Sequence, residues 1–466
     1  MKYLSTRSGL SADFASVVAS GLAPDGGLYL PERFPVLDSA TRTRLGRSDY
    51  AEAVAVVGSA FGGDALDGRA WRALGEATAA AFRHGAVAPL SEIDAGHFLL
   101  ELFHGPTLSF KDYGLQPLAR LLSMLGRADK RPLFILGATS GDTGSAAIEA
   151  FRGREDARIA ILHPHGRVSD IQRRQMTTVT DPNVLNLAIE GSFDDCQRIA
   201  KAVLLARAAK GEETVLSVNS INWGRLLFQT AYHVHTACRL AALGRPLALS
   251  VPSGNFGNAL SAIIAAMMGA PIAHLVVASN ANDALTRFFR EGHVRSGKVE
   301  ETLSPAMDIQ IPSNLERFLH LLAGRDPDVT SAAMIALRET GELARPEIRT
   351  GQPPMTIEAA SIGDEDILAT IARLYRETDR ILDPHSAVAV AAMRGAQALP
   401  GDALRLSVAT AHPAKFGEAV ARALGFAPPL PAALSALVQQ EERYEVLPAD
   451  EEHIEERIAA FLKALP

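Results

Sequence analysis

One lysine in this chain occupies a setting in which its amine could act as a nucleophile. Lys111 lies in segment 103–112 (FHGPTLSFKD), after a turn set by Gly105 and Pro106 and at the start of a predicted helix. Its apolar neighbours Leu108 and Phe110 would lower the pKa of the amine by restricting its solvation, which exposes a nucleophile. A solvated lysine at a helix start is the plain alternative, and the local sequence leaves both open.

A glycine-rich turn follows a predicted strand at residues 253–258 (SGNFGN). Glycines let backbone amides converge on an anion, and the N-terminus of the following helix adds partial positive charge. The turn is therefore of the phosphate-binding type, although strand-to-helix turns also use glycine for geometry alone. Neither a Walker A pattern nor Gly-x-Gly-x-x-Gly is present, which argues against nucleoside triphosphates and dinucleotides as ligands.

Two further polar turns precede predicted helices. At residues 139–144 (TSGDTG), Ser140 and Thr143 can cap the next helix, or the amides of the turn can bind a carboxylate. At residues 219–225 (NSINWGR), Arg225 can bind a phosphate with two parallel hydrogen bonds, unless it is an ordinary surface arginine. Two anion turns beside a candidate lysine favour a phosphorylated amino acid and a phosphorylated cofactor, because each phosphate needs its own site.

Metal chemistry finds little support in the sequence. His163 and His165 form a His-x-His pair at the end of a predicted strand, but no third ligand with suitable spacing follows. We therefore predict a polar loop at this position and no metal site. The acidic run at residues 441–456 predicts the solvated face of a helix.

Short aliphatic stretches that lead into polar turns and then into apolar-periodic helices recur along the chain. We predict strands at residues 131–138, 213–218, 246–251 and 405–409, followed by helices that end near Phe151, Leu240, Met268 and Leu424. Such alternation predicts parallel sheets, which bind ligands at the carboxyl ends of their strands, where all four turns lie. Helical patterns at residues 51–61 and 71–83 predict a separate N-terminal domain.

The composition is that of an ordinary globular protein. The 466 residues are 47% hydrophobic and 21% charged, which allows two or three domains, and the net charge of -7 offers no surplus for nucleic acid or anionic lipid. With only Cys196 and Cys238 present, we expect a reducing compartment, the cytoplasm. We find no signal-peptide pattern at the start, and the most apolar region, residues 259–278, is too interrupted to span a membrane.

Taken together, the motifs resemble those of the threonine synthase family, within the fold-type II group of pyridoxal-phosphate (PLP) enzymes. The resemblance covers nearly the whole chain, and the combination of motifs in this order is highly specific. It is carried by segments 3–7 (YLSTR), 21–31 (GLAPDGGLYLP), 104–112 (HGPTLSFKD), 139–144, 219–222, 254–258, 383–386 (DPHS) and 410–415 (TAHPAK).

This resemblance implies an α/β protein of PLP fold-type II, with two parallel-sheet lobes and an extra N-terminal domain. We expect the N-terminal domain at residues 1–95. A small domain at residues 96–240 would carry the PLP lysine and the substrate turn, and a large domain at residues 241–466 would carry the loop for the PLP phosphate.

The resemblance also assigns roles to individual residues. Lys111 would hold PLP as a Schiff base, and the cofactor's phosphate would be received by Gly254, Asn255, Phe256, Gly257 and Asn258. The hydroxyl of Thr410 would meet the pyridine nitrogen, and Asp142 would lie near the phenolic oxygen. The substrate carboxylate would be held by Thr139, Ser140, Gly141 and Thr143, and the leaving phosphate by Asn219, Ser220, Arg225 and, next in order, Lys415.

The implied reaction converts O-phospho-L-homoserine and water into L-threonine and phosphate by γ-elimination and β-addition, the last step of threonine biosynthesis. The expected binding partner is then a small molecule, and we expect binding to neither nucleic acid nor membranes. We also expect the protein to be a monomer. One alternative is a phospho-lyase that releases 2-oxobutyrate and ammonia from the same substrate. A threonine or serine dehydratase would not need a second phosphate site, and a non-catalytic binding protein would not need the lysine.

Overall fold

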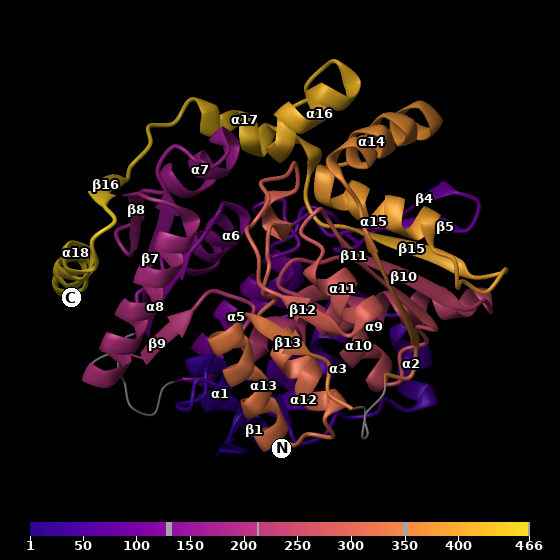
Figure 1. The fold of residues 1–466 in the computed structure, drawn as a ribbon, viewed down its shortest axis with the longest axis horizontal. Coiled ribbons are helices and arrows are strands. Elements are labelled where there is room, and N and C mark those ends of the chain that lie inside the picture. Colours follow the sequence, from indigo (N-terminus) through magenta and orange to yellow (C-terminus); the bar gives the residue numbers. More distant parts are fainter. Residues whose placement is uncertain (127–132, 212–213, 348–352, 465–466) are drawn as a thin grey trace.

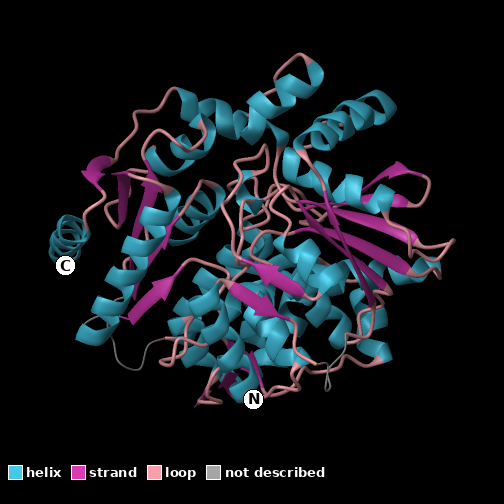
Figure 2. Cartoon of the chain, viewed as in Figure 1, coloured by secondary structure: helices cyan, strands magenta, loops and turns pink. Residues whose placement is uncertain are grey.

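The computed structural model describes residues 1–126, 133–211, 214–347 and 353–464, and it is built around two large sheets (Figure 1). One sheet lies on the left of the view and the other on the right, with helices packed against both (Figure 2). Residues that directly follow strands of both sheets line a single cavity between them. The carboxyl ends of the strands therefore meet at one place, as the sequence predicts.

The smaller sheet has the strand order β16-β8-β7-β6-β9, and every neighbouring pair is parallel. Its interior strands β6 and β7 are buried along their whole length, as expected for a parallel sheet covered on both faces. The strands are β6 (Leu133–Ala138), β7 (Ala157–Pro164), β8 (Val184–Glu190), β9 (Thr214–Ser217) and β16 (Glu445–Pro448). The associated helices are α5 (Asp112–Leu125), α6 (Asp142–Phe151), α7 (Asp170–Thr177), α8 (Phe193–Lys210) and α18 (Glu451–Lys463).

The larger sheet has the order β14-β11-β10-β15-β5-β4, in which only the edge strand β4 is antiparallel to its neighbour. Its strands are β4 (Leu90–Asp94), β5 (His97–Glu101), β10 (Leu247–Pro252), β11 (His274–Ser279), β14 (Thr356–Ser361) and β15 (Leu404–Ala409). The helices of this part are α10 (Gly257–Met267), α11 (Ala284–Glu291), α14 (Asp364–Thr378), α15 (Pro384–Gly395), α16 (Gly417–Leu424) and the short η4 (Pro413–Phe416).

The N-terminal residues pack against α9 (Trp223–Leu240), a helix that is buried on nearly all sides. The ring of Trp223 lies 5.8 Å from that of Tyr3 and 5.3 Å from that of Phe61, so the N-terminal region shares one hydrophobic core with the centre of the molecule. This region comprises β1 (Tyr3–Ser5), β2 (Ser11–Ala12), α1 (Phe14–Ser20), β3 (Tyr29–Pro31), α2 (Ser39–Leu45), α3 (Tyr50–Gly62), η1 (Gly63–Ala65) and α4 (Gly68–Ala79).

The remaining elements surround the larger sheet or connect the two halves. They are η2 (Ala241–Leu243), β12 (His293–Arg295), η3 (Pro305–Met307), α12 (Leu315–Leu322), α13 (Pro327–Thr340), β13 (Glu342–Ala344) and α17 (Ala432–Val438). In the described segments, we find no helix that combines the length and apolar character required to cross a membrane.

The predicted strand and helix pairs are present with small shifts at their ends. Strands β9, β10 and β15 match the predictions within a residue or two, and β6 starts at Leu133, with residues 131 and 132 outside the described part. The helix predicted to follow the 139–144 turn begins within it, at Asp142, so half of that turn is the first turn of α6.

The strands of each sheet come from both sides of the boundaries expected near residues 95 and 240. Strands β4 and β5 straddle the first boundary and both pair in the larger sheet, whereas β16, from the C-terminal end, pairs with β8 in the smaller one. The yellow C-terminal segment in Figure 1 crosses the top of the molecule to reach this sheet. The acidic run at 441–456 is therefore not one helix face as predicted, because β16 occupies its middle and α18 begins only at Glu451.

Candidate active site

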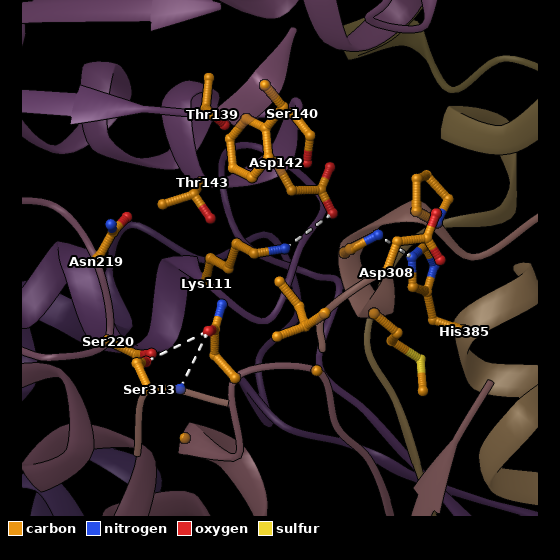
Figure 3. Close-up of a pocket in the computed structure, with 18 of the residues that line it drawn as sticks. Lys111, Thr139, Ser140, Asp142, Thr143, Asn219, Ser220, Asp308, Ser313 and His385 are labelled. Carbon is orange, nitrogen blue, oxygen red and sulfur yellow. Dashed lines mark hydrogen bonds and ion pairs between the residues drawn. The ribbon is translucent and has the colours of Figure 1, made fainter. Parts of the chain in front are cut away.

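A cavity of about 1020 Å³ lies at the carboxyl ends of both sheets. Every residue that the sequence singled out for cofactor or substrate lines it, except Gly141 and Lys415. Figure 3 shows Lys111 near the middle of the site, with Asn219 and Ser220 to one side and Asp308 and His385 to the other. The three polar turns and the candidate lysine are thus brought to one place by the strand-to-helix connections.

Lys111 is the residue immediately before α5, and its side chain is 10% exposed. Its Nζ lies 3.4 Å from Oδ2 of Asp142 and 5.1 Å from the centre of the Phe110 ring. Burial lowers the pKa of Lys111, the Asp142 carboxylate opposes this, and the nearby charges of Lys415 and Arg225 lower it further. The net pKa lies below the ordinary lysine value, so a larger fraction of the amine is unprotonated and nucleophilic at neutral pH.

Both carboxylate oxygens of Asp142 have hydrogen-bond or charge partners, although the residue also lines the cavity. Its Oδ1 accepts a 2.7 Å hydrogen bond from Nε2 of Gln172 and lies 2.7 Å from Nζ of Lys415, while its Oδ2 faces Lys111 and accepts from Ser109 Oγ at 3.3 Å. Burial by itself would raise the pKa of this carboxyl, but the charges of Lys415 and Lys111 hold it well below its usual range. The carboxylate is therefore ionised.

Gly141 does not line the cavity, yet the geometry of the turn depends on it. Its φ of +146° is in the region that favours glycine, and an added Cβ would lie 2.6 Å from the side-chain carboxamide of Gln172. A side chain here would push Gln172 away from Asp142. The turn is also closed by Thr139, whose Oγ1 accepts hydrogen bonds from the amides of Gly141 and Gly144 at 3.0 and 2.9 Å.

Residues 253–258 connect β10 to α10, and their shape suits a phosphate. An added Cβ on Gly254 would lie 2.7 Å from the carbonyl oxygen of Ala306, and one on Gly257 would lie 3.1 Å from Cβ of Ser220. Phe256 adopts a left-handed conformation with φ of 62° just before the helix starts. The loop thus leaves its amides accessible at a helix N-terminus, where an anion is stabilised.

Two polar side chains of the same loop each have a buried atom that lacks a hydrogen-bond partner within the described part of the chain. Ser253 Oγ and Asn258 Nδ2 form no hydrogen bond to any described residue. The other end of the Asn258 amide is fixed, since its Oδ1 accepts from Tyr232 Oη at 2.6 Å and contacts His233 Nε2 at 2.9 Å. Buried donors of this kind are costly unless a ligand satisfies them, and a phosphate group would do so.

Arg225 lies on the first turn of α9 and is buried, with 3% of its surface exposed. One of its Nη atoms donates to the carbonyl of Val218 at 2.7 Å, but its Nε has no partner among the described residues, and no ion pair joins it to a described carboxylate. Burial lowers its pKa to about 10, which leaves it charged at neutral pH. A buried cation without a carboxylate is a site for an anionic ligand.

Thr410 follows β15, and its backbone is held from two sides. Its amide donates to Ser386 Oγ at 2.9 Å, and its carbonyl accepts from the amide of Phe110 at 2.8 Å. Ser386 in turn donates a short hydrogen bond to Asp383, a residue with no exposed surface that also contacts His385 Nδ1 at 2.9 Å. The DPHS segment (residues 383–386) therefore fixes the backbone of Thr410 through the hydrogen bond to Ser386.

Lys415 is not directed into the cavity. Its side chain has no exposed surface, and its Nζ donates to the carbonyl of Thr107 at 2.8 Å in addition to its contact with Asp142. This position points to a role other than contact with the leaving phosphate.

Several cavity residues were missed from the sequence. Residues 299–313 form one wall, in which Asp308 is held by hydrogen bonds from Asn280 at 2.7 Å and Thr302 at 2.7 Å. His385 Nε2 accepts from the amide of Ala306 in the same wall at 3.2 Å (Figure 3). Only the DPHS segment gave a usable signal, since residues 299–313 contain no glycine-rich turn or strand-to-helix junction.

The structure offers little for a metal ion. No group of three or more metal-binding side chains occurs in the residues with described positions. The predicted polar loop holds for His165, which lies in an exposed turn. His163 is instead buried within β7, and neither of its ring nitrogens has a partner among the residues described.

Comparison with protein families defines the class to which this fold and site belong. A family model described as "Pyridoxal-phosphate dependent enzyme" matches residues 86–347, which contain Lys111 and the 253–258 loop. The 253–258 loop has buried donors without partners among the described residues, and Lys111, whose pKa is lowered, lines the same cavity. Both features fit that cofactor. The chain is thus a PLP-dependent enzyme of fold-type II.

Models for "Threonine synthase N terminus" and "Threonine synthase, C-terminal" match residues 2–78 and 386–458. The threonine synthase of Pseudomonas aeruginosa is 42% identical over 451 residues, which is 96% of each chain. The crystal structure of PLP-bound threonine synthase from Brucella melitensis superposes with a TM-score of 0.92 at 39% identity, and that from yeast with 0.90 at 34%, each over 99% of both chains. The chain belongs to the threonine synthase family.

Proposed function

We propose that this protein converts O-phospho-L-homoserine and water into L-threonine and phosphate, the last step of threonine biosynthesis. Family membership supports the reaction. The observation that carries it within this chain is Arg225, a buried guanidinium with no acidic partner among the described residues, on the wall of a cavity that already has a phosphate loop at 253–258. Two separate anion sites are what a phosphorylated cofactor and a phosphorylated substrate require.

The residues around the 253–258 loop would hold the cofactor. Its phosphate would bind the amides of this loop together with Ser253 and Asn258, the hydroxyl of Thr410 would face the ring nitrogen, and Asp142 the phenolic oxygen. When bound, PLP supplies an electron sink that stabilises negative charge developing on the substrate carbons. A hydroxyl at the ring nitrogen does not hold a proton there as a carboxylate would, which leaves more of the proton chemistry to Lys111.

Lys111 is suited to that proton chemistry. Once its amine is free, it can remove the proton from the α carbon of the substrate and then one from the β carbon. The lowered pKa of Lys111 favours the unprotonated form needed for the first step. The two protons removed in turn from the α and β carbons are returned to the γ and α carbons. Water adds its hydroxyl at the β carbon, and its remaining proton leaves with the phosphate.

The substrate would be oriented by the two turns of the smaller sheet. The turn at 139–144 leads into α6, and Ser140 and Thr143 line the cavity beside this helix N-terminus, where the carboxylate of an amino acid can bind. Asn219, Ser220 and Arg225 lie together at the start of α9 and would hold the γ-phosphate as it leaves. Fixed donors at this position stabilise the charge that develops on the departing group.

A product assay tests the proposal and separates it from a phospho-lyase. Purified protein loaded with PLP is incubated with O-phospho-L-homoserine, and threonine, 2-oxobutyrate and phosphate are measured together. We expect threonine and phosphate to form in equal amounts, with 2-oxobutyrate a minor product. Phosphate release matched by 2-oxobutyrate and ammonia would instead identify the lyase, and no phosphate release would refute both.

We also propose that the enzyme acts as a monomer in the cytoplasm. Cys196 and Cys238 are both buried free thiols, which suits a reducing compartment. The cavity is lined by residues of this one chain, including the lysine and both anion sites, so no second copy is needed to complete it. Light scattering coupled to gel filtration would test this point, since a dimer would elute with twice the mass of the chain.

A further inference from the structure

A second lysine lies directly behind the Lys111–Asp142 pair. Lys415 belongs to η4, which follows β15, and its side chain has no exposed surface. Its Nζ lies 2.7 Å from Asp142 Oδ1 and donates to the carbonyl of Thr107 at 2.8 Å. It does not line the cavity. Lys415 can therefore influence the reacting groups only through Asp142 and through its charge.

Asp142 is the bridge between the two lysines. One carboxylate oxygen faces Lys415 and the other faces Lys111, at 2.7 and 3.4 Å respectively. A second donor to Oδ1, Gln172 Nε2 at 2.7 Å, is neutral. The shorter contact belongs to Lys415, so the carboxylate is held more closely by the lysine outside the cavity than by the one inside it.

The charges around Lys111 leave a local excess of positive charge. Asp142, Lys415 and Arg225 are the groups that act on its pKa in addition to burial. The other nearby carboxyl, Asp112, accepts two hydrogen bonds from Thr107, at 2.9 and 2.8 Å, and burial raises its pKa to about 6. Burying an ammonium in this way is costly. A lone carboxylate beside Lys111 would raise the lysine pKa, and a second cation cancels that effect.

We propose that Lys415 is a positioning residue that holds the Asp142 carboxylate in place and offsets its charge, so that a larger fraction of the Lys111 amine is free to capture the cofactor at neutral pH. This inference rests on the assignment of Lys111 as the cofactor lysine. It goes beyond that assignment by giving a role to a residue that contacts neither cofactor nor substrate.

The test measures how fast the full-length, cofactor-free protein captures PLP as a function of pH. The free amine is the attacking species, so the midpoint of the rate profile follows the pKa of Lys111. We expect Lys415→Met to move this midpoint upward by about one pH unit or more and to slow capture near pH 7 by about tenfold. The matched control, Gln172→Met, removes a neutral donor from the same carboxylate oxygen and should shift the midpoint much less.

A Lys415→Met variant that folds, judged by its circular dichroism, and keeps the wild-type midpoint within about 0.2 unit would overturn the proposal. If that variant does not fold, Lys415→Arg and Lys415→Gln replace it. The arginine variant keeps the charge, so its pH midpoint for PLP capture should equal that of the wild type. The glutamine variant loses the charge and should have a higher midpoint. Equal midpoints for the two variants would overturn the proposal. If Lys111→Ala still binds PLP covalently, the assignment of Lys111 as the cofactor lysine is wrong, which is a different failure from that of the Lys415 proposal.

Discussion

Two regions at the cavity both contain buried cations, but those cations have protein partners in one region and unsatisfied donors in the other. In the lysine cluster, formed by Lys111, Asp142 and Lys415, each charged group has a partner within the protein at 3.4 Å or less. In the anion wall, formed by Arg225 and the 253–258 loop, donors on Arg225, Ser253 and Asn258 have no partner among the residues with described positions.

This difference indicates that the anion wall binds anionic groups and that the lysine cluster carries out proton transfer. A buried donor without a partner costs about 1–3 kcal/mol, so a wall that contains several is arranged for a ligand that brings acceptors. A cluster whose charges are already balanced gains little from a further ion. Its arrangement instead sets the protonation of one amine.

Lys111→Ala removes the one lysine of the cluster that lines the cavity. We expect the covalent link to PLP to disappear and turnover to fall by at least about 10⁴-fold, because no other lysine of the described residues lines the cavity and could take the α proton. Borohydride reduction followed by peptide mapping checks the attachment site in the wild-type protein. A pyridoxyl group found on Lys415 or any other lysine would refute the assignment of Lys111 as the cofactor lysine. The proposed difference between the two regions would then no longer hold.

Gly257→Asp acts on the anion wall alone. It places a side chain 3.1 Å from Ser220 and a negative charge at the N-terminus of α10. We expect the affinity for PLP to fall by at least about 1000-fold, with excess cofactor restoring binding only in part. Gly257→Ala is the matched control, since it adds the same Cβ without charge and should cost far less. Unchanged affinity of the aspartate variant on titration of the cofactor-free protein would exclude this loop as the phosphate site.

The sequence predicted the anion wall better than the lysine cluster. Glycine-rich turns between a strand and a helix are local features, so residues 139–144, 219–225 and 253–258 could be read along the chain. Parallel pairing then places their ends together, and the cavity lining agrees. The strands β9, β10 and β15 lie near their predicted positions for the same reason.

Long-range contacts account for what the sequence did not reveal. The pairing of Lys415 with Asp142 joins residues that no periodicity relates, and β16 adds to the smaller sheet although it lies more than 200 residues after β9. Residues 299–313 line the cavity without any motif, because hydrogen bonds to Asp308 from Asn280 and Asn282 hold them there. Such contacts depend on the assembled fold and not on local pattern.

The most direct test of the anion wall is a comparison of Arg225→Ala with Arg167→Ala. Both arginines line the cavity, but Arg225 is buried and Arg167 is exposed. Loss of a charge-assisted contact of about 2–4 kcal/mol at Arg225 should lower kcat/KM for O-phosphohomoserine by about 30- to 1000-fold. It should weaken inhibition by phosphate as well and leave the absorbance spectrum of bound PLP nearly unchanged.

Arg167→Ala should cost less than about threefold, as expected for an exposed charge. An analogue that lacks the phosphate should bind the wild type and Arg225→Ala about equally. If Arg225→Ala instead keeps full kcat/KM and full inhibition by phosphate, the unpaired guanidinium does not hold the leaving group, and the central claim is contradicted.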